Sequence, residues 1–445
     1  MSFNLLQALR VHNAPVRASE LAERHGVSYP TMWRAAKAAG PQVAQWKQGR
    51  ERILALAREP FRVPVRAVRP DGGVDELESL LPLPAGTRWI DWRGQPRLFA
   101  GLPPELNHAR PQGFLGRAFA HRCAPRYGVA RNPDAWSDDQ VLQVLSETGD
   151  DLPGNLIIGE AAFQRFLRMD LDAVAVDEAD LALALPRLAE RAIAGEVPGS
   201  SPGGEQPKAT AVVRRADGGL RHVMVKFSPV VTAPGDAAGT RWADLLACEA
   251  IALEVLADEG FAVARSRLLD SEGRRFLIAE RFDRQGAVGR RSLVSLGAID
   301  DEYFGQRART WVGAAHRLQH AAMIGAEDAL RLATLYAFGV LIANSDMHYG
   351  NIGLQQGSGE SGEPALRLAP VYDMLPMLYA PQRTEVRAVE FQPQPASITG
   401  LGAGSARQAL AMAQRYWARC ADEPTLSVPF RGIAAANHRA ICRLG

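Results

Sequence analysis

A short polar stretch, ANSDMHYGNIGL at residues 343–354, holds the side chains best suited to chemistry in this chain. Asp346 and Asn351 are five residues apart, with His348 between them. The stretch separates an apolar, helix-like run from a strand-like piece, so we expect a loop that is held at both ends. A D-x-x-x-x-N loop supplies a carboxylate that accepts a hydroxyl proton and an amide oxygen that binds Mg²⁺. The pattern predicts phosphoryl transfer, with Asp346 as catalytic base.

Two further charged positions fit the same chemistry. Lys226 lies in the apolar strand-like piece HVMVKF, and an unpaired ammonium is costly to bury there. It therefore needs an anion, either a ligand phosphate or Glu249 on the following predicted helix. The alternative is an edge strand that turns the lysine to solvent. Asp373 ends the strand-like piece LRLAPVYD, where we expect a second Mg²⁺ ligand beside Asn351.

The glycine-rich segment GSSPGGEQPKAT, residues 199–210, is a candidate phosphate loop. Small residues such as Gly203 and Gly204 let backbone amides approach phosphate oxygens closely, and Lys208 adds a positive charge. A plain turn would explain the two glycines equally well. Pro207 has no amide hydrogen, so this residue cannot contribute to a phosphate cradle.

The first seventy residues carry an uneven share of the charge. The whole chain has a net charge of +2, but residues 1–70 contain twelve Lys/Arg against four acids, which gives +8 and leaves −6 for the remainder. The segment ASELAERHGVSYPTMWRAAKAAG has the pattern of a helix-turn-helix, and the pieces on either side of Gln48–Gly49 predict a hairpin. Together they predict a winged helix-turn-helix that binds DNA.

The recognition helix of this module is expected to begin near Ser28, with Pro30 in its first turn and Met32, Ala35 and Ala36 facing the core. The wing would contact the DNA backbone through its basic side chains. The predicted DNA-binding residues are Ser28, Tyr29, Thr31, Trp33, Arg34, Lys37, Lys47 and Arg50, together with Arg52. A protein-binding winged helix is the alternative.

Length and composition limit the remaining possibilities. A chain of 445 residues is too long for one core, and 47% hydrophobic with 22% charged residues is ordinary for a globular protein. No apolar run is long enough to span a bilayer, and the N-terminus lacks a signal-peptide pattern, so we expect a cytoplasmic protein. The four cysteines form no CxxC pair, which argues against a common zinc site or a disulfide framework.

The coarse pattern predicts an α+β chain whose strand-rich half precedes a helix-rich half, with a cleft between two lobes. From 150 to 282 we expect strands interrupted by one helix near 241–259, and from about 305 helices dominate. The expected divisions are 1–60 for the winged helix-turn-helix, 61–149 for a Pro-, Gly- and Trp-rich part, 150–283 for the strand-rich lobe and 284–445 for the helical lobe.

Four segments, SSPGGEQPKAT, HVMVKF, AERFDR and NSDMHYGN with PVYD, resemble the HipA-type serine/threonine kinases, the toxins of bacterial toxin–antitoxin pairs. The fused helix-turn-helix is similar to that of the YjjJ-type (HipH) subgroup. The resemblance implies a two-lobed protein-kinase-like fold that uses ATP and Mg²⁺. It also implies that residues 61–149 correspond to the family's N-terminal subdomain.

The resemblance further implies particular roles. Asp346 would be the catalytic base, and Asn351 and Asp373 would be the Mg²⁺ ligands. Lys226 would bind the phosphates of ATP. Glu280 and Phe282 would be hinge positions that bind adenine through their backbone, and Ser201 a loop serine that becomes autophosphorylated. The resemblance gives His348 no clear role. An aminoacyl-tRNA synthetase is the protein substrate that it suggests. A separate antitoxin partner stays open, because a helix-turn-helix is already built in.

Other functions remain open at this point. The chain could be a DNA-binding transcriptional regulator whose kinase-like body only binds a nucleotide or effector. It could phosphorylate a small molecule or a nucleic acid, since the phosphate machinery is shared. A nuclease would also use acidic Mg²⁺ ligands, but would leave Lys226 and the glycine-rich loop without a task.

Overall fold

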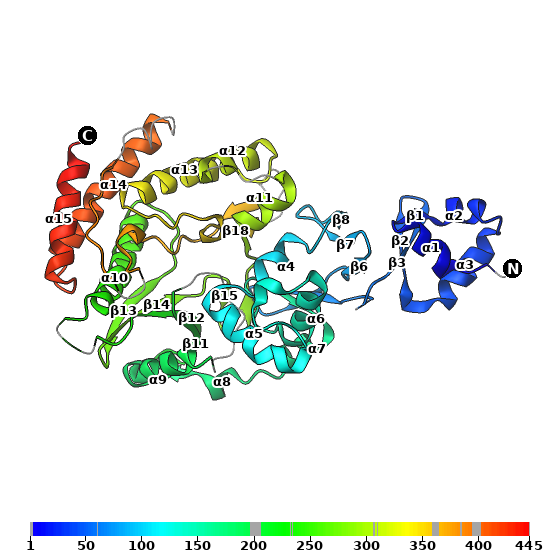
Figure 1. The fold of residues 1–445 in the computed structure, drawn as a ribbon, viewed down its shortest axis with the longest axis horizontal. Helices are drawn as coiled ribbons and strands as arrows, with labels where there is room; N and C mark the ends of the chain where they lie inside the picture. The colour runs from blue at the N-terminus through cyan, green and yellow to red at the C-terminus, as the bar shows by residue number, and fades with distance from the viewer. Residues whose placement is uncertain are drawn as a thin grey trace.

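The protein is described from a computed structural model that covers residues 3–59, 61–195, 206–231, 233, 235–305, 308, 310–357, 365–382, 385–393 and 402–444. The chain is mixed α and β. Figure 1 shows the N-terminal elements at one end of the molecule and helices α14 and α15 at the other. Ser201, Gly203 and Gly204 of the predicted phosphate loop lie outside the described residues.

The N-terminal part consists of three helices and a small antiparallel sheet of order β1-β3-β2. Its elements are α1 (Leu5–His12), β1 (Val16–Arg17), α2 (Ala18–Arg24), α3 (Tyr29–Ala38), β2 (Val43–Gln48) and β3 (Glu51–Leu56). The hydroxyl of Ser28 accepts a hydrogen bond from the amide of Thr31 at 3.3 Å, which caps α3 as predicted. Met32 and Ala36 are buried and Ala35 is half-buried, so the predicted inner face of this helix is confirmed.

The next part is built from two small sheets and three helices around its own apolar core. It contains β4 (Val65–Val68), β5 (Val74–Glu76), β6 (Leu81–Leu83), β7 (Gly86–Ile90), β8 (Pro96–Phe99), α4 (Pro104–Ala109), α5 (Gly113–Tyr127), α6 (Asp138–Thr148) and β9 (Leu156–Ile158). The sequence indicated only a Pro-, Gly- and Trp-rich part here, and its helices were not predicted. Helix α5 was missed because two glycines and Pro125 lie within it.

The strand-rich part centres on a five-stranded sheet of order β10-β11-β12-β14-β13, antiparallel except for the β10–β11 pair. Its strands are β10 (Val176–Asp177), β11 (Lys208–Arg214), β12 (Leu220–Phe227), β13 (Ser266–Ser271) and β14 (Arg274–Glu280). Its helices are α7 (Glu160–Leu167), α8 (Leu171–Val174), α9 (Leu181–Ile193) and α10 (Ala237–Asp258).

The prediction that one helix interrupts these strands is therefore wrong. The alternation of Leu and Ala at the start of α9 has the period of a strand, and Pro186 lies inside this helix. Its buried residues nevertheless recur every three to four positions, at Leu181, Leu185, Ala189 and Ala192. That spacing places them on one helical face against the sheet, and burial of this face outweighs the local pattern.

Helices dominate the C-terminal part, as predicted. Its elements are β15 (Arg284–Gln285), β16 (Gly289–Arg290), β17 (Val294–Ser295), α11 (Leu296–Phe304), α12 (Trp311–His320), α13 (Ala326–Leu341), β18 (Gly353–Gln356), β19 (Leu366–Leu368), α14 (Ala403–Asp422) and α15 (Val428–Cys442). One large apolar cluster joins these helices to α10. Among the described residues, no helix is both long and apolar enough to cross a membrane.

All four cysteines are free thiols, and three of them, Cys123, Cys248 and Cys420, are buried.

Candidate functional site

A cavity of about 1040 Å³ lies where the strand-rich and helix-rich parts meet. Its walls come from β11, β12, β14 and α10 on one side and from the 346–351 and 372–373 loops on the other. Nine residues predicted from the sequence line it: Lys208, Lys226, Glu249, Glu280, Phe282, Asp346, His348, Asn351 and Asp373. Residues far apart in the chain are thus brought to one place.

Lys226 is the buried cation of this cavity. It lies in β12, which is flanked by β11 and β14, so the edge-strand alternative is wrong. Its ammonium donates to both carboxylate oxygens of Glu249, at 2.7 and 2.8 Å, and to Asp373. The strand register places Lys208 directly opposite Lys226 on β11. The predicted Lys226–Glu249 pair is therefore confirmed.

These three charges set one another's protonation. Burial alone would lower the pKa of Lys226, but Asp373 and Glu249 outweigh it and raise that pKa above its ordinary value. Burial would raise the pKa of Asp373, and the positive charges of Lys226 and then Lys208 bring it below the ordinary value. Burial raises the pKa of Glu249 against the opposing pull of Lys226. Lys226 therefore stays positively charged, and the neighbouring Asp373 carboxylate stays ionised.

Asp373 has an unusual backbone. Its φ is +54°, in the left-handed region that favours glycine, asparagine and aspartate. Its amide donates to Glu249 at 3.1 Å, so the same carboxylate holds both the lysine and the backbone of Asp373. This contact fixes the carboxyl group of Asp373 at the cavity wall.

The loop after α13 presents Asp346. The amide of Asp346 donates to the side-chain oxygen of Asn344 at 3.0 Å, and its carboxylate is about half exposed, at 52%. His348 uses Nδ1 to accept from the amide of Gly350 at 3.0 Å, and its Nε2 lies 3.9 Å from the Asp346 carboxylate. His348 thus caps the following turn and lies beside the candidate base.

Asn351 is buried at the end of this loop, and its amide nitrogen donates to the carbonyl of Asp346 at 2.8 Å. The hydrogen bond ties the two ends of the loop together. It also leaves the side-chain oxygen of Asn351 as the atom suited to a cation. Among the described residues, no group of three or more His, Cys, Asp and Glu could hold a metal ion. One carboxylate and one amide oxygen nevertheless suit Mg²⁺, which keeps waters and phosphate oxygens as its other ligands.

The predicted hinge positions are Glu280, the last residue of β14, and Phe282, just after it. The amide of Glu280 already donates to the carbonyl of Arg265 at 2.7 Å, so this backbone N–H is not available to a ligand. The ring of Phe282 packs 5.7 Å from that of Tyr372, whose hydroxyl donates to the carbonyl of Gly350 at 2.8 Å. These contacts connect the hinge to the Asp346 loop.

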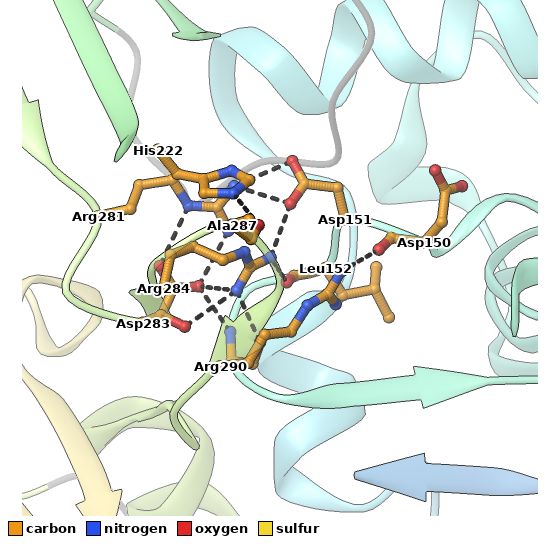
Figure 2. A network of polar contacts seen from close by, with 10 residues as sticks. Asp150, Asp151, Leu152, His222, Arg281, Asp283, Arg284, Ala287 and Arg290 are labelled. Atoms are coloured by element: carbon orange, nitrogen blue, oxygen red, sulfur yellow. Dashed lines mark hydrogen bonds and ion pairs between the residues drawn. The ribbon is translucent and has the colours of Figure 1, made fainter. Parts of the chain in front are cut away.

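A buried ion network behind the hinge was not predicted. Arg281 donates to both oxygens of Asp151 at 2.9 Å and to Asp283, and Arg284 donates to Asp151 and Asp283 at 2.7 Å each. Figure 2 shows Asp151 between the two guanidinium groups. The network fastens residues 150–154 to the hinge. The only signal in the sequence was the run of charges in AERFDR at the end of an apolar strand.

The predicted DNA-binding residues lie away from this cavity, in the N-terminal part. Tyr29, Arg34, Lys37, Lys47 and Arg50 are exposed. Trp33 and Thr31 are half-buried, and the guanidinium of Arg52 lies 4.0 Å over the Trp33 ring. Most of these predicted residues on α3 and on the β2–β3 hairpin are therefore accessible, although Ser28 uses its hydroxyl for the helix cap.

Comparison with known proteins places the chain in a family. The HipA-like C-terminal domain model matches residues 200–429, which is more than half of the chain, and the YjjJ-like toxin middle domain model matches residues 59–167. Toxin YjjJ of Escherichia coli strain K12 is 35% identical over 433 residues, covering 94% of this chain and 93% of that protein. The chain therefore belongs to the YjjJ-like toxins, with a HipA-like C-terminal domain.

Two solved structures resemble this chain with lower sequence identity. HipA from a Shewanella oneidensis MR-1 toxin–antitoxin complex with HipB and operator DNA has a TM-score of 0.43 and 14% identity, covering 77% of this chain and 83% of that one. The Helicobacter pylori proinflammatory kinase CtkA has a TM-score of 0.32 and 13% identity, covering 53% of this chain and 94% of that one.

Proposed function

We propose that the chain is an ATP- and Mg²⁺-dependent serine/threonine protein kinase of the HipA type, with a two-lobed kinase-like body and a DNA-binding winged helix-turn-helix at its N-terminus. The observation that carries the proposal is the Lys226–Glu249–Asp373 contact in a cavity that Asp346 and Asn351 also line. A lysine paired with a helix carboxylate, a metal-binding aspartate, a base and an asparagine are the parts that protein kinases use.

In this proposal each side chain has one task. The half-exposed carboxylate of Asp346 accepts the proton of the substrate hydroxyl, and Asn351 holds the loop that presents it. Lys226, kept charged by its two carboxylates, binds phosphate oxygens of ATP. Mg²⁺, held by Asn351 and Asp373, would neutralise charge on the transferred phosphate.

The adenine of ATP would lie against the hinge. Because the Glu280 amide is already used, its carbonyl or the backbone of Phe282 would make the contact. The glycine-rich loop around Gly203 and Gly204 would cover the phosphates, with Lys208 at its end on β11. We place the functional boundaries at 1–60, 61–149, 150–283 and 284–445.

The first test is mass spectrometry of the purified protein after incubation with Mg²⁺ and ATP, beside Asp346→Asn. Phosphate on Ser201 in the wild type and none in the variant would support an active kinase that modifies its own loop. Measurable ATP binding without phosphate anywhere would favour the second candidate function, a DNA-binding regulator whose body only binds nucleotide. For a protein substrate, the family suggests an aminoacyl-tRNA synthetase, and kinase assays on purified synthetases would check it.

The second candidate has its own support, because the N-terminal part has its own core and exposed basic side chains on α3 and the hairpin. DNA binding through these cations releases counterions, so log K should fall steeply with log salt. The test is a salt titration of DNA binding by the full-length protein, with Arg34→Gln and Lys37→Gln together. A flat salt response would contradict DNA binding by this part.

A further inference from the structure

A second cavity, of about 760 Å³, lies behind the five-stranded sheet. Helices α5, α7 and α9 and strands β11 and β12 form its walls, together with residues 281–290. It is separate from the proposed kinase cleft, since Asp346, Asn351 and Asp373 do not line it. Its size is that of a pocket for a small organic ligand.

The charges around this cavity are unbalanced. Eight arginines and two aspartates line it, a formal excess of six positive charges. Several of these arginines are neutralised by carboxylates: Arg281 and Arg284 by Asp151 and Asp283, Arg165 by Asp150, and Arg126 by Glu147. Arg187 and Arg191, exposed on α9, have no carboxylate partner within the part of the chain that the structure describes.

Arg290 is the exception among the buried arginines that line this cavity. It is 3% exposed, and its Nη2 donates only to the backbone carbonyl of Asp150, as Figure 2 shows. Its Nη1 has no hydrogen-bond partner among the described residues. Burial, and then the neighbouring charge of Arg284, lower the pKa of Arg290 to about 9. Asp151 and Asp283 attract this charge, but neither forms an ion pair with Arg290 and burial outweighs them, so an anion that bonds to the guanidinium directly would offset a remaining desolvation cost.

The rest of the wall is mainly aliphatic. The 171–176 segment contributes Leu171, Val174 and Val176, and α9 contributes Leu181, Leu185 and Leu188. The Arg290 guanidinium lies 4.9 Å over the ring of Phe166, at the border between the charged and apolar walls. A simple ion would leave the apolar surface in water, whereas a ligand with an aliphatic body would bury it.

We propose that this cavity is a binding site for a small amphipathic anion, with a carboxylate or phosphate head at Arg290 and an aliphatic chain between α9 and the 171–176 segment. Such a ligand complements both walls at once. The cavity also reaches the hinge, because Arg281 lines both this cavity and the proposed kinase cleft. The site therefore offers a path by which the ligand would regulate the cleft, a consequence that rests on the proposed function.

The test is isothermal titration calorimetry of nucleotide-free, full-length protein with octanoate and with octyl phosphate, which separate the two head groups. Octylamine serves as the cationic control with the same chain, and inorganic phosphate as the head alone. We expect one site for at least one of the two amphipathic anions, and binding at least about tenfold weaker for octylamine and inorganic phosphate. Equal binding of octylamine, or no heat from either anion, would overturn the proposal.

Two variants locate the site. Ala184→Trp fills the cavity from α9 without removing a charge, whereas Leu183→Trp, its exposed neighbour outside the cavity wall, is the matched control. We expect Ala184→Trp and Arg290→Met each to weaken binding at least about tenfold, and Leu183→Trp to leave it unchanged. Unchanged affinity in Ala184→Trp would place the ligand elsewhere and refute the site, even if Arg290→Met failed to fold.

The link to the cleft has a separate readout. The affinity for ATP, measured with and without saturating octanoate or octyl phosphate, should differ in the wild type but not in Ala184→Trp. A protein that binds the anion but not ATP would contradict the proposed function and leave the site intact. Equal ATP affinity in both conditions would refute the coupling alone.

Discussion

Lys226 and Arg290 are both cations in cavity walls, and they are buried to a similar degree, 6% and 3% exposed. Their surroundings differ. Lys226 has two carboxylates within hydrogen-bonding distance, and its pKa is raised despite burial. Arg290 donates to a backbone carbonyl instead, and its pKa is lowered, first by burial and then by Arg284, which together outweigh the attraction of Asp151 and Asp283. Burial alone thus does not decide what a buried cation does, since its counter-charges set both its protonation and its contribution to folding.

The largest effect is expected for Lys226→Met. Removing the ammonium leaves Glu249 buried without a counter-charge and Asp373 with Lys208 as its remaining positive neighbour, which we expect to cost about 3–5 kcal/mol of unfolding free energy. Urea denaturation of the wild type and the variant measures this. If the proposed function holds, autophosphorylation should also fall by about 10²–10³-fold.

The double variant Lys226→Met with Glu249→Leu is the control for that prediction. Replacing Glu249 as well removes one of the two carboxylates that Lys226 contacts, so part of the lost stability should return while activity should not. Recovery of activity together with stability would show that Lys226 only supports the fold.

For Asp283→Asn, in the buried ion network behind the hinge, we expect a smaller loss of unfolding free energy, of about 3 kcal/mol. Burial would raise the pKa of Asp283, but Arg281 and then Arg284 outweigh it and hold that pKa well below its ordinary value. A depressed pKa in the folded state means that this stability is present above the unfolded pKa of about 4 and is lost as the pH falls below it. Urea denaturation at several pH values should therefore show that the free energy of unfolding falls less steeply with decreasing pH in the variant than in the wild type. An equally steep fall of the unfolding free energy with decreasing pH in both proteins would contradict this account.

Arg290→Met should not lower the free energy of unfolding, in contrast to Lys226→Met. No carboxylate forms an ion pair with Arg290, and burial outweighs the attraction of Asp151 and Asp283, so its replacement by an apolar side chain of similar length should leave stability unchanged or raise it by about 1 kcal/mol. Thermal and urea unfolding check this in ligand-free protein. If Arg290→Met lowered the unfolding free energy as much as Lys226→Met, the two cations would not differ in their contribution to folding.

The smallest effect on stability is expected for Arg34→Gln, because this cation is exposed. The free energy of unfolding should change by no more than about 0.5 kcal/mol. If Arg34 contacts a DNA phosphate, the salt dependence of DNA binding should lose about one unit of slope. Glu20, an exposed acid on α2, offers a control when changed to Gln, since it should leave that slope unchanged or increase it.

The sequence predicted the cleft better than the network behind the hinge. A lysine inside an apolar strand demands a nearby anion, and this requirement pointed to Glu249 on the next helix. The Asp346–Asn351 spacing likewise kept the loop residues together. Asp151 and Arg281, by contrast, are 130 residues apart, and nothing in the local pattern of either segment indicates the other. Pairing of distant charges depends on the tertiary fold, so it became visible only in the structure.

Secondary structure shows the same limit. Strand β12 contains the strand-like piece HVMVKF that was predicted, since this apolar run has clear borders. Helix α9 was missed because its Leu-Ala alternation and Pro186 have the local signature of another conformation. Its helical form depends on burial against the sheet, which no local window contains.

The left-handed backbone of Asp373 limits how this position can vary over evolutionary time. Glutamate would keep the charge but is poorly suited to a φ of +54°, glycine would keep the backbone but lose the charge, and asparagine would keep the shape but lose the ion pair with Lys226. In a saturation library selected for function, position 373 should therefore accept aspartate almost alone, whereas selection for folding alone should enrich glycine and asparagine.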